Sequence, residues 1–364
     1  MRPTTVQEAA DLLTGFEQPV RPVGGGTKPW LPDRGEAVLE TGGLDRILEH
    51  NVGDFTAVLE AGVPFADAQQ AFAEHGQRLA WDPPEGGRDG RLATVGGIVA
   101  TADSGPLRHR YGGVRDLVVG MNVVLSDGTI AKSGGKVIKN VAGYDVAKLF
   151  AGSFGTLGLI ASVSVRLHPL PDRTATVVIE HHNPDQLLED VLQLARRPLE
   201  ADKFDVTWTG GHGRILMEFS GASALDQAGR VGTIRDVDWD DVRALQRGAV
   251  VVKVSGRPTD LPKVIRAADS HSGTVISRAA LGLSWIGLQS ADAVAAIRAG
   301  SKRAFRRSIT TCPATSAGHC PSAAPSSTVQ CRGASASRMP ATPSAFCSAI
   351  HDSPSAARET TVPP

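Results

Sequence analysis

The fold of this chain is decided by residues 81–169, which read WDPPEGGRDGRLATVGGIVATADSGPLRHRYGGVRDLVVGMNVVLSDGTIAKSGGKVIKNVAGYDVAKLFAGSFGTLGLIASVSVRLHP. Glycines recur in pairs between the short apolar runs, at positions 96–97, 112–113 and 134–135. A turn needs only one glycine, so repeated glycines beside Thr and Ser indicate backbone brought close to another group, with N–H groups that can bind an anion. A loop-rich β domain with many tight turns explains the same spacing, and the glycines alone do not separate the two interpretations.

An earlier glycine segment points the same way. A predicted strand at 19–23 runs into Gly24-Gly25-Gly26-Thr27-Lys28. The spacing of a P-loop is absent, and Pro29 prevents the immediate helix of a Rossmann turn. A strand that ends in three glycines, Thr and Lys can still wrap a pyrophosphate with main-chain N–H groups.

Around these segments the sequence predicts alternating helices and strands. Thr5 and Glu8 are spaced as a capping box at the start of a helix over 5–13, and Asp127-Gly128 predicts a hairpin turn. Further helices are expected at 44–50, 64–75, 94–102 and 144–150, and strands at 37–40, 55–60, 117–125, 130–132 and 159–167. This alternation favours an α/β or α+β domain over residues 1–171.

After the prolines at 169 and 171 the pattern changes. Two β-α-β-β sets are expected, at 175–180, 183–197, 204–209 and 214–220, and at 249–254, 260–269, 274–279 and 283–288, followed by a helix at 290–299. Two such sets predict a ferredoxin-like antiparallel sheet with helices on one face, forming a second domain over residues 172–302. The predicted fold class is α+β.

From residue 303 the chain is rich in Ser, Ala, Pro, Thr and Arg. Such a segment buries too little apolar surface to offset its chain entropy, so residues 303–364 are predicted to be disordered. All four cysteines lie there, at spacings that match no metal motif: Cys312, Cys320, Cys331 and Cys347. The segment is either a natural flexible tail or a frame-shifted end, and its abrupt start favours the second.

The composition excludes several classes of protein. Lys plus Arg and Asp plus Glu both number 38, so the charge balance indicates no nucleic-acid partner. No apolar run approaches the roughly 20 residues of a membrane span, and the N-terminus lacks the apolar region of a signal peptide. We expect a cytoplasmic protein, associated with a membrane only peripherally through partners.

Taken in order, four segments resemble one family: RPVGGGTK (21–28), ATVGGIVATADSG (93–105), RYGGVRDLVVG (110–120) and GGKVIKNVAGYDVAKLFAGSFGTLGLI (134–160). The chain is similar, over about residues 1–300, to the FAD-binding fold of the p-cresol methylhydroxylase (PCMH) and vanillyl-alcohol oxidase type. Within that fold it resembles the FAD-binding subunits of bacterial glycolate oxidases (glycolate dehydrogenases).

The resemblance implies a set of cofactor-binding residues. The first pyrophosphate loop would be Gly24, Gly25, Gly26 and Thr27, and the second Thr94, Val95, Gly96 and Gly97. Gly105, Tyr111 and Gly112 would line the cofactor further along, and Gly158 and Ile160 would present backbone to the flavin. Neither loop offers the His or Cys that covalent members use, so non-covalent FAD is expected. Lys28 is expected to be a solvated loop lysine. His109 is expected to be a loop histidine that is solvated or faces a phosphate.

The resemblance also implies a function. The chain would be the FAD-binding subunit of a glycolate (2-hydroxy acid) oxidase or dehydrogenase complex, with a catalytic FAD subunit and an iron–sulfur subunit as partners. No metal motif and no general base can be named, and Arg108 and Arg110 are weak candidates for contacts with a substrate carboxylate. A non-catalytic FAD-binding assembly subunit and a free-standing flavin oxidase acting on another alcohol remain as alternatives.

Overall fold

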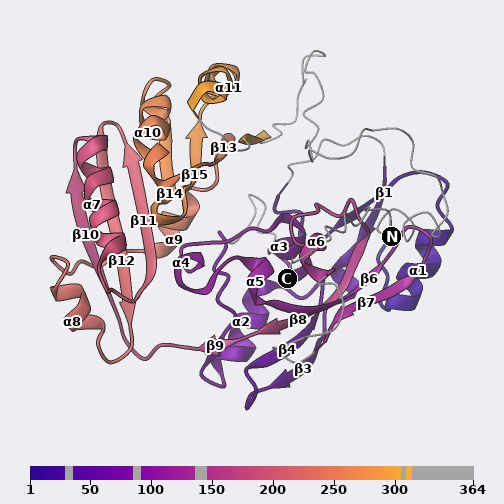
Figure 1. Cartoon of the computed structure of the whole chain (residues 1–364). Coiled ribbons are helices and arrows are strands. Elements are labelled where there is room, and N and C mark those ends of the chain that lie inside the picture. The colour runs from indigo at the N-terminus through magenta and orange to yellow at the C-terminus, as the bar shows by residue number, and fades with distance from the viewer. Residues whose placement is uncertain (29–35, 85–91, 136–145, 305–308, 314–364) are drawn as a thin grey trace, which may run out of the picture. The chain divides into compact units, whose positions relative to one another are not determined.

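The computed structural model describes residues 1–28, 36–84, 92–135, 146–304 and 309–313, with side chains as far as residue 298. This part of the chain is a mixture of helices and strands (Figure 1). Its strands form a five-stranded sheet, a seven-stranded sheet and two short two-stranded sheets. No helix among these residues has the length and apolar character needed to cross a membrane.

The chain begins with helix α1 (Val6–Thr14), and the predicted capping residues mark its start. Thr5 Oγ1 accepts a hydrogen bond from the Glu8 amide at 3.1 Å, while the Glu8 carboxylate accepts from the Thr4 amide at 2.8 Å. The helix buries Ala9 and Ala10 in a small cluster beneath strand β2 (Ala37–Glu40). Strand β1 (Val20–Val23) pairs with β2 in parallel. The first glycine turn follows directly after β1, so its start is fixed by this pairing.

The five-stranded sheet has the order β3-β4-β8-β6-β7, and all its pairings are antiparallel. The strands are β3 (Ile47–Asn51), β4 (Thr56–Glu60), β6 (Val118–Val124), β7 (Ile130–Gly134) and β8 (Leu159–Arg166). The expected helix at 44–50 is wrong, because residues 47–51 pair with β4 as an edge strand. The expected hairpin is confirmed: Gly128 has a φ of 79°, and the Asp127 carboxylate accepts from the Thr129 amide at 2.9 Å.

Short helices cover this sheet and share one core with it. They are α2 (Phe65–Ala73), α3 (Val95–Thr101), α4 (Arg108–Tyr111), α5 (Val114–Leu117) and α6 (Ala147–Phe150). Phe65, Phe72 and Trp81 are all almost fully buried there. Strand β5 (Gln77–Arg78) follows α2 and pairs with β9 (His168–Pro169) in a two-stranded sheet. Helices α2 and α3 confirm their predictions, whereas α4, α5 and β9 are too short for a periodic pattern to predict.

The seven-stranded sheet is antiparallel throughout, in the order β10-β12-β11-β14-β15-β13-β16. Its strands are β10 (Thr174–His181), β11 (Ala201–Thr209), β12 (His212–Ser220), β13 (Val250–Ser255), β14 (Thr274–Arg278), β15 (Leu283–Leu288) and β16 (Ile309–Pro313). The first six match the predicted strands within a few residues. Helices α7 (Pro184–Arg196) and α10 (Leu261–Asp269) pack on one face of this sheet, visible in the left half of Figure 1.

Other parts of this region depart from the expectation. Helix α9 (Trp239–Ala244) packs on the opposite face, with Trp239 beside Leu216 and Trp285, so the helices do not all share one side. Helices α8 (Ala224–Gly229) and α11 (Asp292–Ala304) complete the region. Strand β16 pairs with β13 inside the segment that was expected to be disordered. Residues 314–364 lie outside the described part of the chain.

Candidate functional site

The two predicted pyrophosphate turns lie against each other. A Cβ on Gly24 would lie 2.2 Å from Thr94 Oγ1, and a Cβ on Gly25 would lie 1.7 Å from the carbonyl oxygen of Leu92. No side chain fits at either distance, so only glycine permits this approach. The repeated glycines therefore bring backbone close to backbone, as their spacing predicts.

The first turn presents main-chain donors that have no acceptor. Within the described ranges, the amides of Gly24, Gly25 and Gly26 donate to no backbone or side-chain group. Gly26 has a φ of 64°, which turns the chain at the end of this run of donors. Successive free N–H groups at such a turn form a concavity that suits an anion.

The second turn is different, because the amides of Val95, Gly96 and Gly97 already have acceptors. It begins helix α3, with Thr94 as the N-cap. A Cβ on Gly96 would lie 2.5 Å from the Cβ of Ala61, so this glycine is required by close packing on strand β4 and the turn after it. The amides of Val95, Gly96 and Gly97 donate to Val63 O at 2.9 Å, Ala61 O at 2.7 Å and Thr94 Oγ1 at 3.3 Å.

A third glycine segment lies beside the first. A Cβ on Gly155 would be 3.4 Å from the Pro22 ring, and the Gly152 amide donates to Val99 O at 3.0 Å. Gly158 has a φ of 147°, and its close neighbour is the carbonyl oxygen of Val124. Ile160 lies in β8 and is buried in the core of the five-stranded sheet. The motif residues KNVAGYD (139–145) lie outside the described ranges.

Gly105 is held by a buried acid that sequence reasoning missed. A Cβ on Gly105 would lie 1.7 Å from the carbonyl oxygen of Asp82, whose carboxylate accepts the Leu107 amide at 3.0 and 3.1 Å. Burial raises the pKa of Asp82 to about 7, against the opposing charges of Lys203, Arg243 and Arg278. Asp82 also has a φ of 39°, a strained backbone for a residue with a side chain.

The Tyr111 hydroxyl is engaged by residues outside the glycine turns. It accepts from Arg78 Nη2 at 3.1 Å and donates to Asp202 Oδ2 at 3.5 Å, while the ring lies 4.5 Å from that of His168. Burial lowers the pKa of His168 to about 4, helped by the charges of Arg166 and Arg78. Gly112 follows with a φ of 81° at the end of α4.

Lys28 is not the solvated lysine that was expected. Its Nζ lies 3.2 Å from Asp103 Oδ2, and each of the two side chains is only 6% exposed. Arg247 Nη2 lies 3.4 Å from the same oxygen. Burial raises the pKa of Asp103, but the charges of Lys28 and Arg247 outweigh it and hold that pKa below its usual value. A lone Asp in the ADSG motif gave no signal of this role in the sequence.

Of the cationic residues in α4, His109 and Arg110 contact the seven-stranded sheet, whereas Arg108 bonds within its own segment. His109, which was expected to be solvated or phosphate-facing, packs its ring edge on Phe204 at 5.5 Å, with a buried Nδ1 that has no hydrogen-bond partner among the described residues. Arg110 Nε lies 3.3 Å from Asp202 Oδ1. Arg108 donates to Ser104 Oγ at 3.2 Å. Neither arginine is a free surface group in this arrangement.

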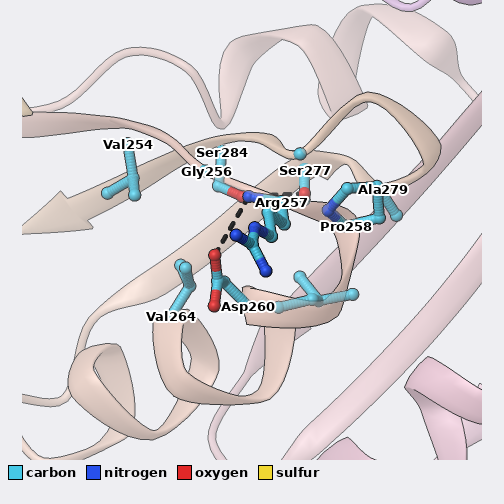
Figure 2. A pocket seen from close by; sticks show the side chains of 11 residues that line it. Val254, Gly256, Arg257, Pro258, Asp260, Val264, Ser277, Ala279 and Ser284 are labelled. Carbon is cyan, nitrogen blue, oxygen red and sulfur yellow. Dashed lines mark hydrogen bonds between the residues drawn. The ribbon is translucent and has the colours of Figure 1, made fainter. Parts of the chain in front are cut away.

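A small pocket lies elsewhere, between α10 and strands β13 to β15 (Figure 2). The hydroxyls of Ser277 and Ser284 bond to each other at 2.8 Å, and the Arg257 amide donates to Asp260 at 3.0 Å. None of the predicted site residues lines it. In the described part of the chain, no three His, Cys, Asp or Glu side chains gather as a metal site.

Comparison with known proteins gives a domain and a fold. A family model described as an FAD binding domain matches residues 1–134. The solved structures of alkyldihydroxyacetonephosphate synthase and of the Bermuda grass isoallergen BG60 share the fold, with TM-scores of 0.64 and 0.61 at 14% sequence identity. They cover 84% and 85% of this chain, which in turn covers 70% and 78% of theirs.

Relatives of known name match part of the chain. Glycolate oxidase subunit GlcD of Bacillus subtilis is 35% identical over 52% of this chain and 41% of its own length. The mitochondrial D-lactate dehydrogenase [cytochrome] of Arabidopsis thaliana is 31% identical over 48% of this chain and 31% of its own length. Glycolate oxidase subunit GlcE of Escherichia coli is 36% identical over 34% and 35%. The aligned part is less than half the length of each of these relatives, which are named as oxidases or dehydrogenases of hydroxy acids. Residues 1–134 thus match the model of an FAD-binding domain, and FAD is the cofactor of such a domain.

Proposed function

We propose that the first glycine turn holds the pyrophosphate of FAD without a covalent link. The observation that carries this proposal is the row of amides at Gly24, Gly25 and Gly26 that have no acceptor among the described residues, at a turn where close contacts require glycine at positions 24 and 25. Main-chain donors of this kind attract the two phosphates. Lys28 makes no direct contact with them in this proposal, because it is already paired with Asp103. No His or Cys lies in either turn to form a covalent bond with the flavin.

In this proposal the two turns have unequal parts. Gly24 to Thr27 contact the phosphates, whereas Thr94, Val95, Gly96 and Gly97 build the surface on which the first turn rests. The remaining residues of the proposed cofactor site lie further along: Gly105, Tyr111, Gly112, Gly158 and Ile160. We also propose the domain limits 1–171 for FAD binding and 172–302 for a ferredoxin-like cap, to whose sheet β16 adds the outer strand.

The proposed activity is the oxidation of a small 2-hydroxy acid by a subunit of a glycolate-type oxidase or dehydrogenase complex. The support is the sequence similarity to two glycolate oxidase subunits and to D-lactate dehydrogenases. Bound flavin supplies the electron-accepting chemistry, while the protein orients substrate and cofactor. The proposed partners are a catalytic FAD subunit and an iron–sulfur subunit that takes the electrons.

One observation favours a non-catalytic FAD-binding subunit as a second candidate. The charged groups where α4 meets β11 are taken up by internal pairs: Asp202 binds Arg78 and Arg110, and Arg278 binds Asp205 at 2.8 Å. Groups held in this way are poorly placed to accept a substrate proton. Bleaching of the flavin by glycolate or D-lactate in the isolated chain would favour the enzyme, and bleaching only with partner subunits would favour the assembly role.

The first experiment is a visible spectrum of the purified full chain before and after acid precipitation. We expect a flavin band at about 450 nm that stays in the supernatant, as non-covalent FAD does. Gly25→Ala should weaken FAD binding by about tenfold or more, since its Cβ must displace the Leu92 carbonyl. Gly53→Ala is the matched control, because a Cβ there meets nothing within 4 Å.

Two results would contradict the proposal. Colour in the acid pellet would mean a covalent link, and a folded wild-type chain that neither contains nor takes up FAD would remove the cofactor site. Equal FAD affinity in Gly25→Ala and wild type would show that the first turn does not hold the cofactor.

A further inference from the structure

The first glycine turn is anchored at both ends. At its start, Gly24 and Gly25 rest on the backbone that leads into helix α3. At its end, Lys28 forms its ion pair with Asp103, which lies shortly after the same helix. The amides of Gly24, Gly25 and Gly26, which have no acceptor among the described residues, lie at the first anchor and before the second, so the shape of the turn depends on both.

The carboxylate of Asp103 joins three segments at one oxygen. Its Oδ2 is 3.2 Å from Lys28 Nζ and 3.4 Å from Arg247 Nη2. Arg247 follows helix α9, which packs on the seven-stranded sheet, and the same Nη2 also donates to the Pro84 carbonyl at 2.7 Å. A buried carboxylate with two cationic partners stays charged, and its removal leaves those cations unpaired.

We propose that Lys28, Asp103 and Arg247 form a charge clamp that sets the phosphate-binding turn and couples FAD binding to the docking of α9 and its sheet. This inference rests on the proposed function, since it takes the anion at Gly24–Gly26 to be the pyrophosphate of FAD. Asp103 is a positioning residue and does not touch the cofactor. Lys28 holds the turn and leaves the phosphates to the main chain.

The coupling follows from the shared oxygen. A ligand that orders the turn maintains the ion pair between Lys28 and Asp103. This ion pair in turn keeps the Asp103 carboxylate within reach of Arg247. Coupling between two binding events is reciprocal, so docking of α9 strengthens FAD binding and FAD protects α9 from opening. A change at Arg247, far along the sequence from the glycine turn, therefore alters the affinity for FAD.

The direction in which one substitution changes the FAD affinity distinguishes a positioning role from a purely electrostatic one. Asp103→Asn removes a negative charge near the proposed pyrophosphate site, which by charge alone would tighten FAD binding. The clamp predicts the opposite: the dissociation constant of FAD for the deflavinated full chain, measured by flavin fluorescence, rises by about tenfold. Arg247→Met should raise it in the same direction, and Arg247→Lys should restore part of the affinity.

A matched control is Arg230→Met, which removes an arginine from an exposed pair with Asp226 and should leave FAD binding unchanged. Hydrogen exchange gives a second measurement: saturating FAD should slow exchange in residues 239–247 of the wild type, and this protection should disappear in Asp103→Asn. If Asp103→Asn does not fold, the partly exposed Arg247 decides the matter through its two variants.

The outcomes distinguish this inference from the function on which it rests. A wild-type chain without FAD binding overturns both. FAD binding in the wild type, with equal or tighter binding in Asp103→Asn and in Arg247→Met, overturns the clamp and leaves the cofactor site intact. Weaker binding in both, with the lost protection at 239–247, supports the clamp.

Discussion

The two glycine turns have similar composition and opposite chemistry. Gly24 to Gly26 present amides with no acceptor among the described residues, whereas the amides of Val95, Gly96 and Gly97 are all occupied. In both turns a Cβ would collide with backbone or a neighbouring side chain. Glycine is required in each, but only the first turn has donors to spare for a ligand.

The difference teaches that a glycine-rich turn can be a ligand site or the support for one. The second turn is tied to the backbone at Ala61 and Val63, so it forms a fixed wall. The segment around Gly105 resembles the second turn, because the Leu107 amide there is taken by the Asp82 carboxylate. Substitutions in the supporting segments should therefore change stability, and substitutions in the first turn should change affinity.

The largest expected effect is at Asp82. Its pKa of about 7 in the folded chain lies above its ordinary value of 3.8, so the folded state holds this proton more tightly. The resulting stabilisation is complete below about pH 4 and is lost as the pH rises towards 7, a change on the order of 4 kcal/mol. Asp82→Asn keeps an acceptor for the Leu107 amide and removes the titration.

The measurement is the free energy of unfolding of Asp82→Asn minus that of the wild type, followed from pH 4.5 to 8. We expect this difference to rise in favour of the variant up to about pH 7 and then to level off. A difference that stays flat would show that Asp82 does not titrate in this range and that its segment is held in another way.

The second effect is at Gly96. Gly96→Ala should lower the free energy of unfolding by about 1–3 kcal/mol, since the added methyl overlaps Ala61 and the backbone there cannot move away. Chemical denaturation of the FAD-free chain measures it, with Gly229→Ala as control because a Cβ there meets nothing within 4 Å. Unchanged stability with reduced FAD affinity would place the second turn in the same class as the first.

The smallest effect is at Thr94. Thr94→Ala removes the cap of α3 and should cost about 1 kcal/mol of stability, while Thr94→Ser keeps the hydroxyl and should recover most of it. The FAD affinity of the folded Thr94→Ala variant should be close to that of the wild type. A large loss of affinity that Ser restores would make this hydroxyl part of the binding surface.

The sequence predicted the elements that have a clear period. Helix α7 and the strands of both large sheets other than β3 and β16 follow from apolar spacing, and α3 follows from Thr94 before an apolar run. Strand β3 was mistaken for a helix because its exposed edge lacks alternation, and its pairing with β4 decides its form. The chain after 303 reads as disordered by composition, but backbone pairing with β13 places β16 within it.

The site was less accessible to sequence reasoning. Close approach of the glycines could be predicted, because no other residue tolerates such contacts. The hydrogen bonds that occupy the amides of the second turn could not be predicted, since the acceptors at Ala61 and Val63 lie in another segment. Lys28 looked solvated because its partner Asp103, and Arg247 on the same carboxylate, are distant in sequence.

The pairing of β16 with β13 has a practical consequence for handling the protein. Strand β13 reads VVVKVS, and without residues 309–313 it would be the outer strand of its sheet. Valine-rich outer strands offer unpaired N–H and C=O groups to other chains and promote aggregation. A shortened chain made for crystallisation should therefore end after Pro313, since a cut near residue 302 would expose a self-association edge.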